Sequence, residues 1–148
     1  IIIGVIMIVF TKKSKAYRMK LGFIGLGNVG SKLAGSLLRN KFDLTVRDLD
    51  KNLTNMFLNI GAKVANSGKE LAEQVDLIVT CLPSPKICAE VMEAEDGVIN
   101  GLSENKIWLE MSTTDEAEIK RISKKIITKK SYFLRWTCEW WVSQSCHR

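Results

Sequence analysis

The stretch GFIGLGNVG, residues 22–30, decides how this chain of 148 residues is interpreted. Three of its glycines, Gly25, Gly27 and Gly30, have the spacing G-x-G-x-x-G. The apolar run that leads up to Gly25 predicts a strand, and residues 28–40 have the apolar period of a helix. Such glycines alone are weak evidence because turns are rich in glycine. Between a strand and a helix, however, they predict a loop that holds the pyrophosphate of a dinucleotide.

Each glycine of this loop has an expected role. Gly25 allows the tight turn, Gly27 lets the backbone approach the pyrophosphate, and Gly30 lets the helix pack closely on the strand. The helix N-terminus offers free N–H groups and a partial positive charge to the phosphates. An ordinary strand-to-helix turn is the structural alternative. We predict that six consecutive residues bind the dinucleotide: Gly25, Leu26, Gly27, Asn28, Val29 and Gly30.

An acidic residue, Asp48, follows Gly30 by 18 residues and lies at the end of the second predicted strand, just after residues 43–46. A carboxylate there accepts hydrogen bonds from the ribose hydroxyls and repels a 2′-phosphate, so we predict NAD as the cofactor in preference to NADP. Arg47 could hold that phosphate, but neighbouring strand residues point to opposite faces, which should keep it out of the site. The structural alternative for Asp48 is a solvated turn residue.

The remaining sequence alternates between short apolar runs and helical periods. Further strands are predicted at 62–65, 75–83, 106–111 and 131–134, and further helices at 51–60, after the capping box Ser67–Glu70, after Ser84-Pro85, and at 112–130. This alternation predicts an α/β fold of the Rossmann type, a doubly wound open parallel sheet.

Three helices should each bury one apolar stripe. Their positions recur with helical spacing, and the stripes are Val29, Leu33 and Leu37; Leu53, Met56, Phe57 and Ile60; and Ile119, Ile122 and Ile126. The uninterrupted apolar run VDLIVTCLP, 75–83, predicts a strand covered on both faces.

Charge and cysteine content exclude two classes of partner. The net charge of +6 arises in the flanks, because residues 21–134 carry equal numbers of acidic and basic side chains. We therefore expect no nucleic-acid partner. Cys81 and Cys88 have no zinc-ligand spacing and are expected to pack as small apolar residues, so no metal is predicted.

Residues 1–18 form an apolar and basic leader. Its ten opening residues are too few to span a bilayer, which needs about 20, and its basic residues follow the apolar run, which is the reverse of a signal peptide. A cut membrane anchor and a short interfacial segment are alternatives. We favour upstream sequence before a start at Met19, outside the fold, and hence a cytoplasmic protein with no membrane partner.

Four stretches together resemble the β-hydroxyacid dehydrogenases, the family of 3-hydroxyisobutyrate dehydrogenase and tartronate semialdehyde reductase. They are GFIGLGNVG (22–30), GAKVANSGKELAEQVDLIVTCLP (61–83), GVINGL (97–102) and LEMSTTD (109–115). The resemblance covers residues 19–134 and implies one NAD-binding domain there. It also implies that Leu82 and Pro83 line the cofactor cleft and that Thr113 reaches the nicotinamide side, next to Ser112, which could instead cap the following helix.

The resemblance implies further parts that this sequence does not contain. Family members continue with a glycine-rich substrate loop and a C-terminal helical domain, which supplies the catalytic lysine and completes a homo-oligomer. No catalytic residue is therefore predicted here, and the intact enzyme would act on a small 3-hydroxy carboxylate. Glu110 stands where the family usually has aspartate.

Two other functions remain open at this point. One is a non-catalytic nucleotide-binding or interaction module. The other is a 6-phosphogluconate or imine-reducing relative, although Asp48 argues against the phosphogluconate branch.

The tail RWTCEWWVSQSCHR, 135–148, is expected to be aberrant. Its two cysteines and one histidine fall short of the four ligands of tetrahedral zinc, and its tryptophans form no helical stripe. Where it stands, the family expects Asp-(Ala or Gly)-Pro-Val-Ser-Gly-Gly. One permitted set of codons, read one base later, encodes Asp-Gly-Pro-Val-Ser-Gly-Gly, and the tryptophan codons force three of the glycines. We therefore expect a shifted reading frame.

Overall fold

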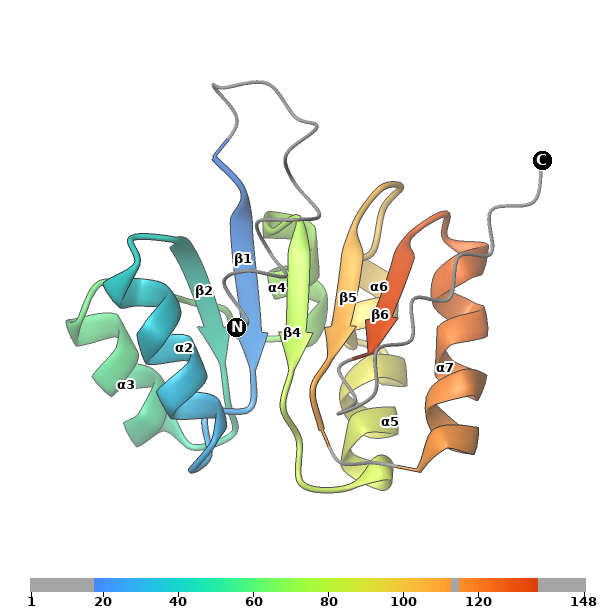
Figure 1. Ribbon diagram of the computed structural model, residues 1–148, viewed down its shortest axis with the longest axis horizontal. Coiled ribbons are helices and arrows are strands. Elements are labelled where there is room, and N and C mark those ends of the chain that lie inside the picture. Colours follow the sequence, from blue (N-terminus) through green and yellow to red (C-terminus); the bar gives the residue numbers. More distant parts are fainter. Residues whose placement is uncertain (1–17, 113–114, 136–148) are drawn as a thin grey trace.

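The computed structural model describes residues 18–112 and 115–135 and contains one six-stranded parallel sheet (Figure 1). The strand order is β3-β2-β1-β4-β5-β6. The strands are β1 Lys20–Ile24, β2 Asp43–Arg47, β3 Lys63–Val64, β4 Leu77–Thr80, β5 Ile107–Glu110 and β6 Tyr132–Arg135. The order reverses between β2 and β4, which lie on either side of β1, and crevices at such a reversal are where open α/β sheets bind ligands. The predicted Rossmann-type fold is confirmed.

Helices cover both faces of the sheet. They are α2 Gly30–Arg39, α3 Lys51–Asn59, α4 Gly68–Gln74, α5 Pro85–Glu93, α6 Val98–Gly101 and α7 Glu116–Thr128. Buried side chains of α2 and α3 join one core cluster, whereas those of α4, α5, α6 and α7 join the other. Adjacent residues of β1 divide between the two clusters, Phe23 in the first and Ile24 in the second. This alternation is the period-2 signature of a strand buried on both faces.

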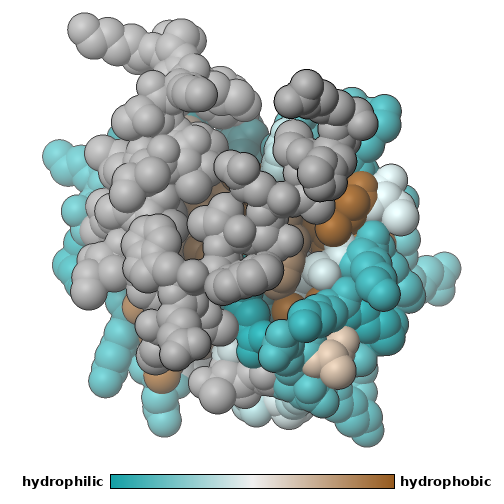
Figure 2. Space-filling model, turned by 45° about the vertical axis from the view of Figure 1, so that its right-hand side comes forward, coloured by the Kyte–Doolittle hydropathy of each residue, from teal (hydrophilic) through white to brown (hydrophobic). Residues whose placement is uncertain are grey.

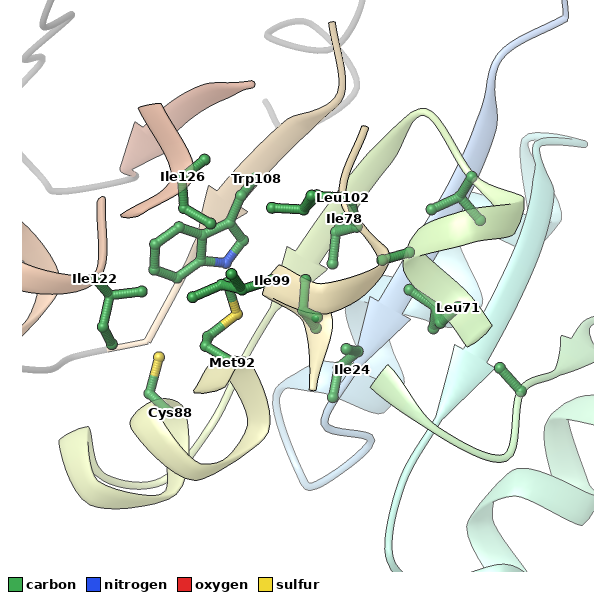
Figure 3. Close-up of a cluster of buried hydrophobic side chains, with 14 of the residues drawn as sticks. Ile24, Leu71, Ile78, Cys88, Met92, Ile99, Leu102, Trp108, Ile122 and Ile126 are labelled. Carbon is green, nitrogen blue, oxygen red and sulfur yellow. The ribbon is translucent and has the colours of Figure 1, made fainter. Parts of the chain in front are cut away.

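The α4–α7 cluster is organised around Trp108 of β5, which is fully buried. Figure 3 shows the indole between Ile122 and Ile126 of α7 and Met92 of α5. The ring of Phe133 on β6 lies 4.9 Å away, centroid to centroid. Burial of large side chains at roughly 25 cal/mol per Å² of apolar surface is the main stabilising contribution to such a layer.

Polar side chains fix the start of four helices. Asp50, Ser67, Ser84 and Asp115 each accept a hydrogen bond from a backbone N–H group in the first turn of α3, α4, α5 and α7. The predicted capping box is half correct. Ser67 Oγ accepts from the N–H group of Glu70, but the carboxylate of Glu70 accepts from Asn66 N and not from Ser67 N.

Several element boundaries differ from the sequence prediction. Helix α2 begins at Gly30, so Val29 is 61% exposed and not part of a buried stripe. On α3, Phe57 is buried as predicted, but Met56 and Ile60 are more than half exposed, because the short helix touches the sheet along a narrow line. Strands β4 and β5 are shorter than their apolar runs, and the predicted stripe of α7 is confirmed.

Helix α6 was not predicted. At four residues it is too short to show a helical period. The predicted leader and tail lie outside the described residues, apart from Arg18 and from Arg135, which belongs to β6. No helix in the described ranges is both long and apolar enough to cross a membrane. The described part of the face in Figure 2 is mostly hydrophilic.

An ion cluster joins α5 to α7. Glu93 accepts hydrogen bonds from both terminal nitrogens of Arg121, and Lys125 pairs with the same carboxylate. The hydrogen bond from Arg121 is the largest cause that lowers the pKa of Glu93 from 4.5 to about 2. A carboxyl group with a lowered folded-state pKa stabilises the fold above its unfolded-state pKa and loses that contribution as the pH falls through the folded value.

Glu93→Gln should therefore reduce the free energy of unfolding by about 1 kcal/mol at pH 7, since the cluster is partly solvated. The difference from the parent should fade as the pH falls from 4.5 to 2, where the parent carboxylate is itself protonated. Urea denaturation at several pH values measures this. Glu95→Gln is the control, because Glu95 is exposed and forms no side-chain ion pair within the described ranges. If the difference in unfolding free energy between Glu93→Gln and the parent were the same at pH 7 and at pH 2, the lowered pKa of Glu93 would be contradicted.

Candidate functional site

The loop between β1 and α2 turns sharply at Gly25. Its φ is +97°, in the region that side chains rarely adopt. A Cβ atom at Gly25 would overlap the carbonyl oxygen of Cys81, and the Gly25 N–H group donates to the carbonyl of Arg47 at 3.1 Å. The fold itself therefore requires glycine here.

The fold requires glycine at Gly30 but not at Gly27. A Cβ atom at Gly30 would overlap the carbonyl oxygen of Gly25, so the close approach of α2 to β1 depends on glycine. A Cβ atom at Gly27 would meet nothing within 4 Å, and Gly27 has no positive φ. Neither packing nor backbone geometry in the described chain demands glycine at Gly27, and the space beside it is open.

The N–H groups at the start of α2 are available to a ligand. Those of Gly27, Asn28 and Val29 donate to no acceptor in the described ranges, and all three residues are exposed. Helix α2 has no acidic residue in its first turn and no side-chain cap. This end of the helix dipole is thus uncompensated, in contrast to the capped starts of α3, α4, α5 and α7, and it suits an anion.

Asp48 joins this loop to the loop after β2. Its Oδ2 accepts from the N–H group of Leu26 at 2.5 Å, and its Oδ1 accepts from Asp50 N at 2.9 Å. The prediction placed Asp48 at the ribose, and its position beside the glycine loop fits that role. A carboxylate oxygen has more than one acceptor site, so these two bonds leave capacity for ribose hydroxyls.

Arg47 points away from Asp48. Its partner in register on β1 is Ile24, which packs in the α4–α7 cluster, and side chains paired in this way share a face. The two residues form no ion pair, and Arg47 Nε is buried without a hydrogen-bond partner in the described chain. The expectation that Arg47 lies outside the site agrees with this geometry.

The loops after β4 and β5 complete the same edge of the parallel sheet, toward which the labelled strand arrows point in Figure 1. Leu82 is half-buried, Pro83 is exposed, and Leu82 N donates to the hydroxyl of Ser112 at 2.7 Å. Ser112 therefore joins the two loops and does not cap α7, whose cap is Asp115. Thr113, the residue expected near the nicotinamide, lies outside the described residues.

Sequence reasoning missed a buried polar network under these loops. Glu110, fully buried at the end of β5, accepts hydrogen bonds from Thr80, Cys88 and the N–H group of Ser112. Its only signal in the sequence was a charged residue closing an apolar strand. Burial, and then the charge of Glu110, raise the pKa of the Cys88 thiol, so Cys88 is no nucleophile at neutral pH. The described residues contain no group of three metal-binding side chains.

Comparisons with known proteins agree with this geometry. The family model for the NAD binding domain of 6-phosphogluconate dehydrogenase matches residues 20–136. The mitochondrial 3-hydroxyisobutyrate dehydrogenase of Mus musculus is 30% identical over 122 residues, which are 82% of this chain and 36% of the relative. The probable 3-hydroxyisobutyrate dehydrogenase of Dictyostelium discoideum is 38% identical over 108 residues, 71% of this chain and 34% of the relative.

Solved structures show the same fold. A 3-hydroxyisobutyrate dehydrogenase from Salmonella typhimurium is 25% identical with a TM-score of 0.71, and the match covers 78% of this chain and 40% of that one. The V8 variant of an imine reductase from Myxococcus stipitatus, in complex with NAD+, is 18% identical with a TM-score of 0.73, and the match covers 80% of this chain and 40% of that one. The chain spans only about a third of the length of the mouse and Dictyostelium relatives. It belongs to the family of NAD-binding domains represented by that of 6-phosphogluconate dehydrogenase, and its relatives include 3-hydroxyisobutyrate dehydrogenases.

Proposed function

We propose that residues 19–134 bind NAD as the dinucleotide domain of an oxidoreductase that acts on the CH–OH group of a small 3-hydroxy carboxylate. One observation carries the proposal: the uncapped start of α2 presents unpaired N–H groups beside the open space at Gly27. A pyrophosphate supplies the negative charge and acceptor oxygens that this arrangement lacks. Gly25, Leu26, Asn28, Val29 and Gly30 form the rest of the cradle.

The remaining cofactor contacts are proposed from the sheet edge. Asp48 would hold the adenine ribose, and Leu82, Pro83 and Thr113 would line the cleft toward the nicotinamide. The substrate class rests on relatives named 3-hydroxyisobutyrate dehydrogenase, and 2-hydroxy-3-oxopropionate is a compound of the same type. Imine reductases of similar fold have been solved with NADP+ and, as a V8 variant, with NAD+, so the fold does not decide between the cofactors. The proposed preference for NAD therefore rests on Asp48 alone.

A non-catalytic role is the second candidate. A relative from Pongo abelii that is 28% identical over 115 residues is named cytokine-like nuclear factor N-PAC. The oxidoreductase requires dinucleotide binding and, once the rest of the protein is attached, turnover, whereas a non-catalytic module requires no turnover.

Substitutions at Gly27 and Gly30 should separate an effect on cofactor binding from an effect on folding. Gly27→Ala should leave thermal stability unchanged, because its methyl group meets no protein atom, but should weaken NADH binding about tenfold or more by obstructing the pyrophosphate. Gly30→Ala should instead lower the melting temperature, because its methyl group overlaps the backbone at Gly25. Fluorescence titration with NADH and thermal unfolding measure the two effects. If the parent chain binds no NADH while folded, the proposal is wrong.

Asp48→Ala should weaken NADH binding about tenfold, because charged hydrogen bonds to the ribose are lost, and should weaken NADPH binding much less. Both cofactors should lose some affinity, because Asp48 also accepts hydrogen bonds from Leu26 N and Asp50 N and so shapes the loop. Asp50→Ala is the matched control: it removes the cap of α3 and should affect both cofactors slightly and equally. Equal losses of NADH and NADPH in Asp48→Ala would show that Asp48 acts on the loop alone.

The chain of 148 residues should bind NADH yet turn over no 3-hydroxyisobutyrate. Hydride transfer needs a substrate held against the nicotinamide and a group that exchanges the hydroxyl proton, and neither is assigned to a residue of this chain. Absorbance at the NADH band after addition of NAD+ and hydroxyacid tests this. Sustained turnover by the purified chain would mean that a catalytic residue lies within it.

A further inference from the structure

The carboxyl group of Glu110 lies between two strand ends. Thr80 and Glu110 are the last residues of β4 and β5 and are partners in register. The hydroxyl oxygen of Thr80 lies 2.8 Å from the indole nitrogen of Trp108 and 2.5 Å from Oε2 of Glu110. Because an indole N–H group can only donate, the Thr80 oxygen accepts from Trp108 and is free to donate its own proton to Glu110.

The other neighbours of Glu110 are also donors. The thiol of Cys88 on α5 lies 3.3 Å from Oε2, and the N–H group of Ser112 lies 2.6 Å from Oε1. Cys88 and Trp108 belong to the same core cluster (Figure 3). Both carboxyl oxygens are thus acceptors, which is the pattern that an ionised carboxylate satisfies.

This carboxylate is fully buried and forms no ion pair within the described residues. Glu110 and Thr80 are 0% exposed, and none of the ion pairs of the described chain includes Glu110. A buried charge is costly unless its hydrogen bonds are satisfied, and an apolar side chain would fill the same space at lower cost. Packing alone therefore does not account for glutamate at this position.

The network leads from Glu110 to both loops at the sheet edge. Oε1 holds Ser112 N, and the hydroxyl of Ser112 in turn accepts from Leu82 N at 2.7 Å. Fixing the carboxylate thus fixes the start of the loop after β5 relative to the loop after β4. The loop after β4 carries Leu82 and Pro83, which the proposed function assigns to the cofactor cleft.

We propose that Glu110 is a positioning residue for the nicotinamide half of the cofactor, acting through Ser112 and Leu82 on the loops after β5 and β4. This inference rests on the proposed function, and it extends the site beyond the residues that contact the dinucleotide. Thr80 orients the carboxylate, and Trp108 sets the direction of the Thr80 hydrogen bond. The adenosine half, held by the glycine loop and Asp48, does not depend on this network.

The test compares NADH with ADP, which carries only the adenosine and pyrophosphate. In the full chain, Glu110→Gln keeps the shape of the side chain but replaces one acceptor oxygen with a donor NH₂ group. It should weaken NADH binding about tenfold, as the loss of one or two hydrogen bonds predicts, and change ADP binding less than about twofold. Thr80→Val, which removes one donor to the carboxylate, should likewise weaken NADH binding more than ADP binding.

Thr45→Val is the matched control, because Thr45 is also a buried strand threonine, on β2, but lies outside the network. It should leave the ratio of NADH to ADP affinity unchanged. Equal losses of NADH and ADP in Glu110→Gln and Thr80→Val, or no loss of either, would overturn the positioning role. If Glu110→Gln fails to fold, Thr80→Val decides. A parent chain that binds neither ligand overturns the proposed function, and the positioning role falls with it.

Discussion

The approach of α2 to the end of β1 is the constraint on which the site depends. It requires Gly25 at a positive φ and Gly30 against the Gly25 carbonyl, because a side chain at either position would overlap backbone. With the two elements this close, the start of α2 places N–H groups without an acceptor in the described chain beside the open space at Gly27. Asp48 then fixes the loop from the neighbouring strand through Leu26 N. The packing of α2 against β1 thus also forms the anion site.

The fold could be predicted from sequence because its signals are local and agree with one another. Apolar runs such as 75–83, the proline at Pro85 and the isoleucines of α7 each identify an element without knowledge of its neighbours. The alternation of strands and helices then leaves few topologies. Helix α6 was not predicted because four residues are too few to show a helical period. The exposure of Met56 and Ile60 was not predicted either, because apolar spacing shows which residues share a helix face but not how much of that face is covered.

The site was predictable only in part. The glycine spacing and Asp48 could be recognised because the dinucleotide motif places these residues at fixed distances from one another along the chain. The partners of Asp48 were not visible, since Leu26 N and Asp50 N are backbone groups that no pattern singles out. The network of Glu110 joins residues up to 30 positions apart, on two strands and a helix, so only the folded chain brings them together. Ser112 shows the consequence: a local interpretation suggested a helix cap, whereas its hydroxyl binds the loop after β4.

Mapping of amide chemical shifts during titration with NAD+ tests the central claim most directly. The account predicts that the largest changes fall on the N–H groups of Gly27, Asn28 and Val29, which have no acceptor in the described chain and should gain the pyrophosphate oxygens. Smaller changes should extend to Leu26, whose N–H group already binds Asp48. Changes confined to another face of the sheet, or saturable binding that leaves these three amides unmoved, would contradict the assignment of the site.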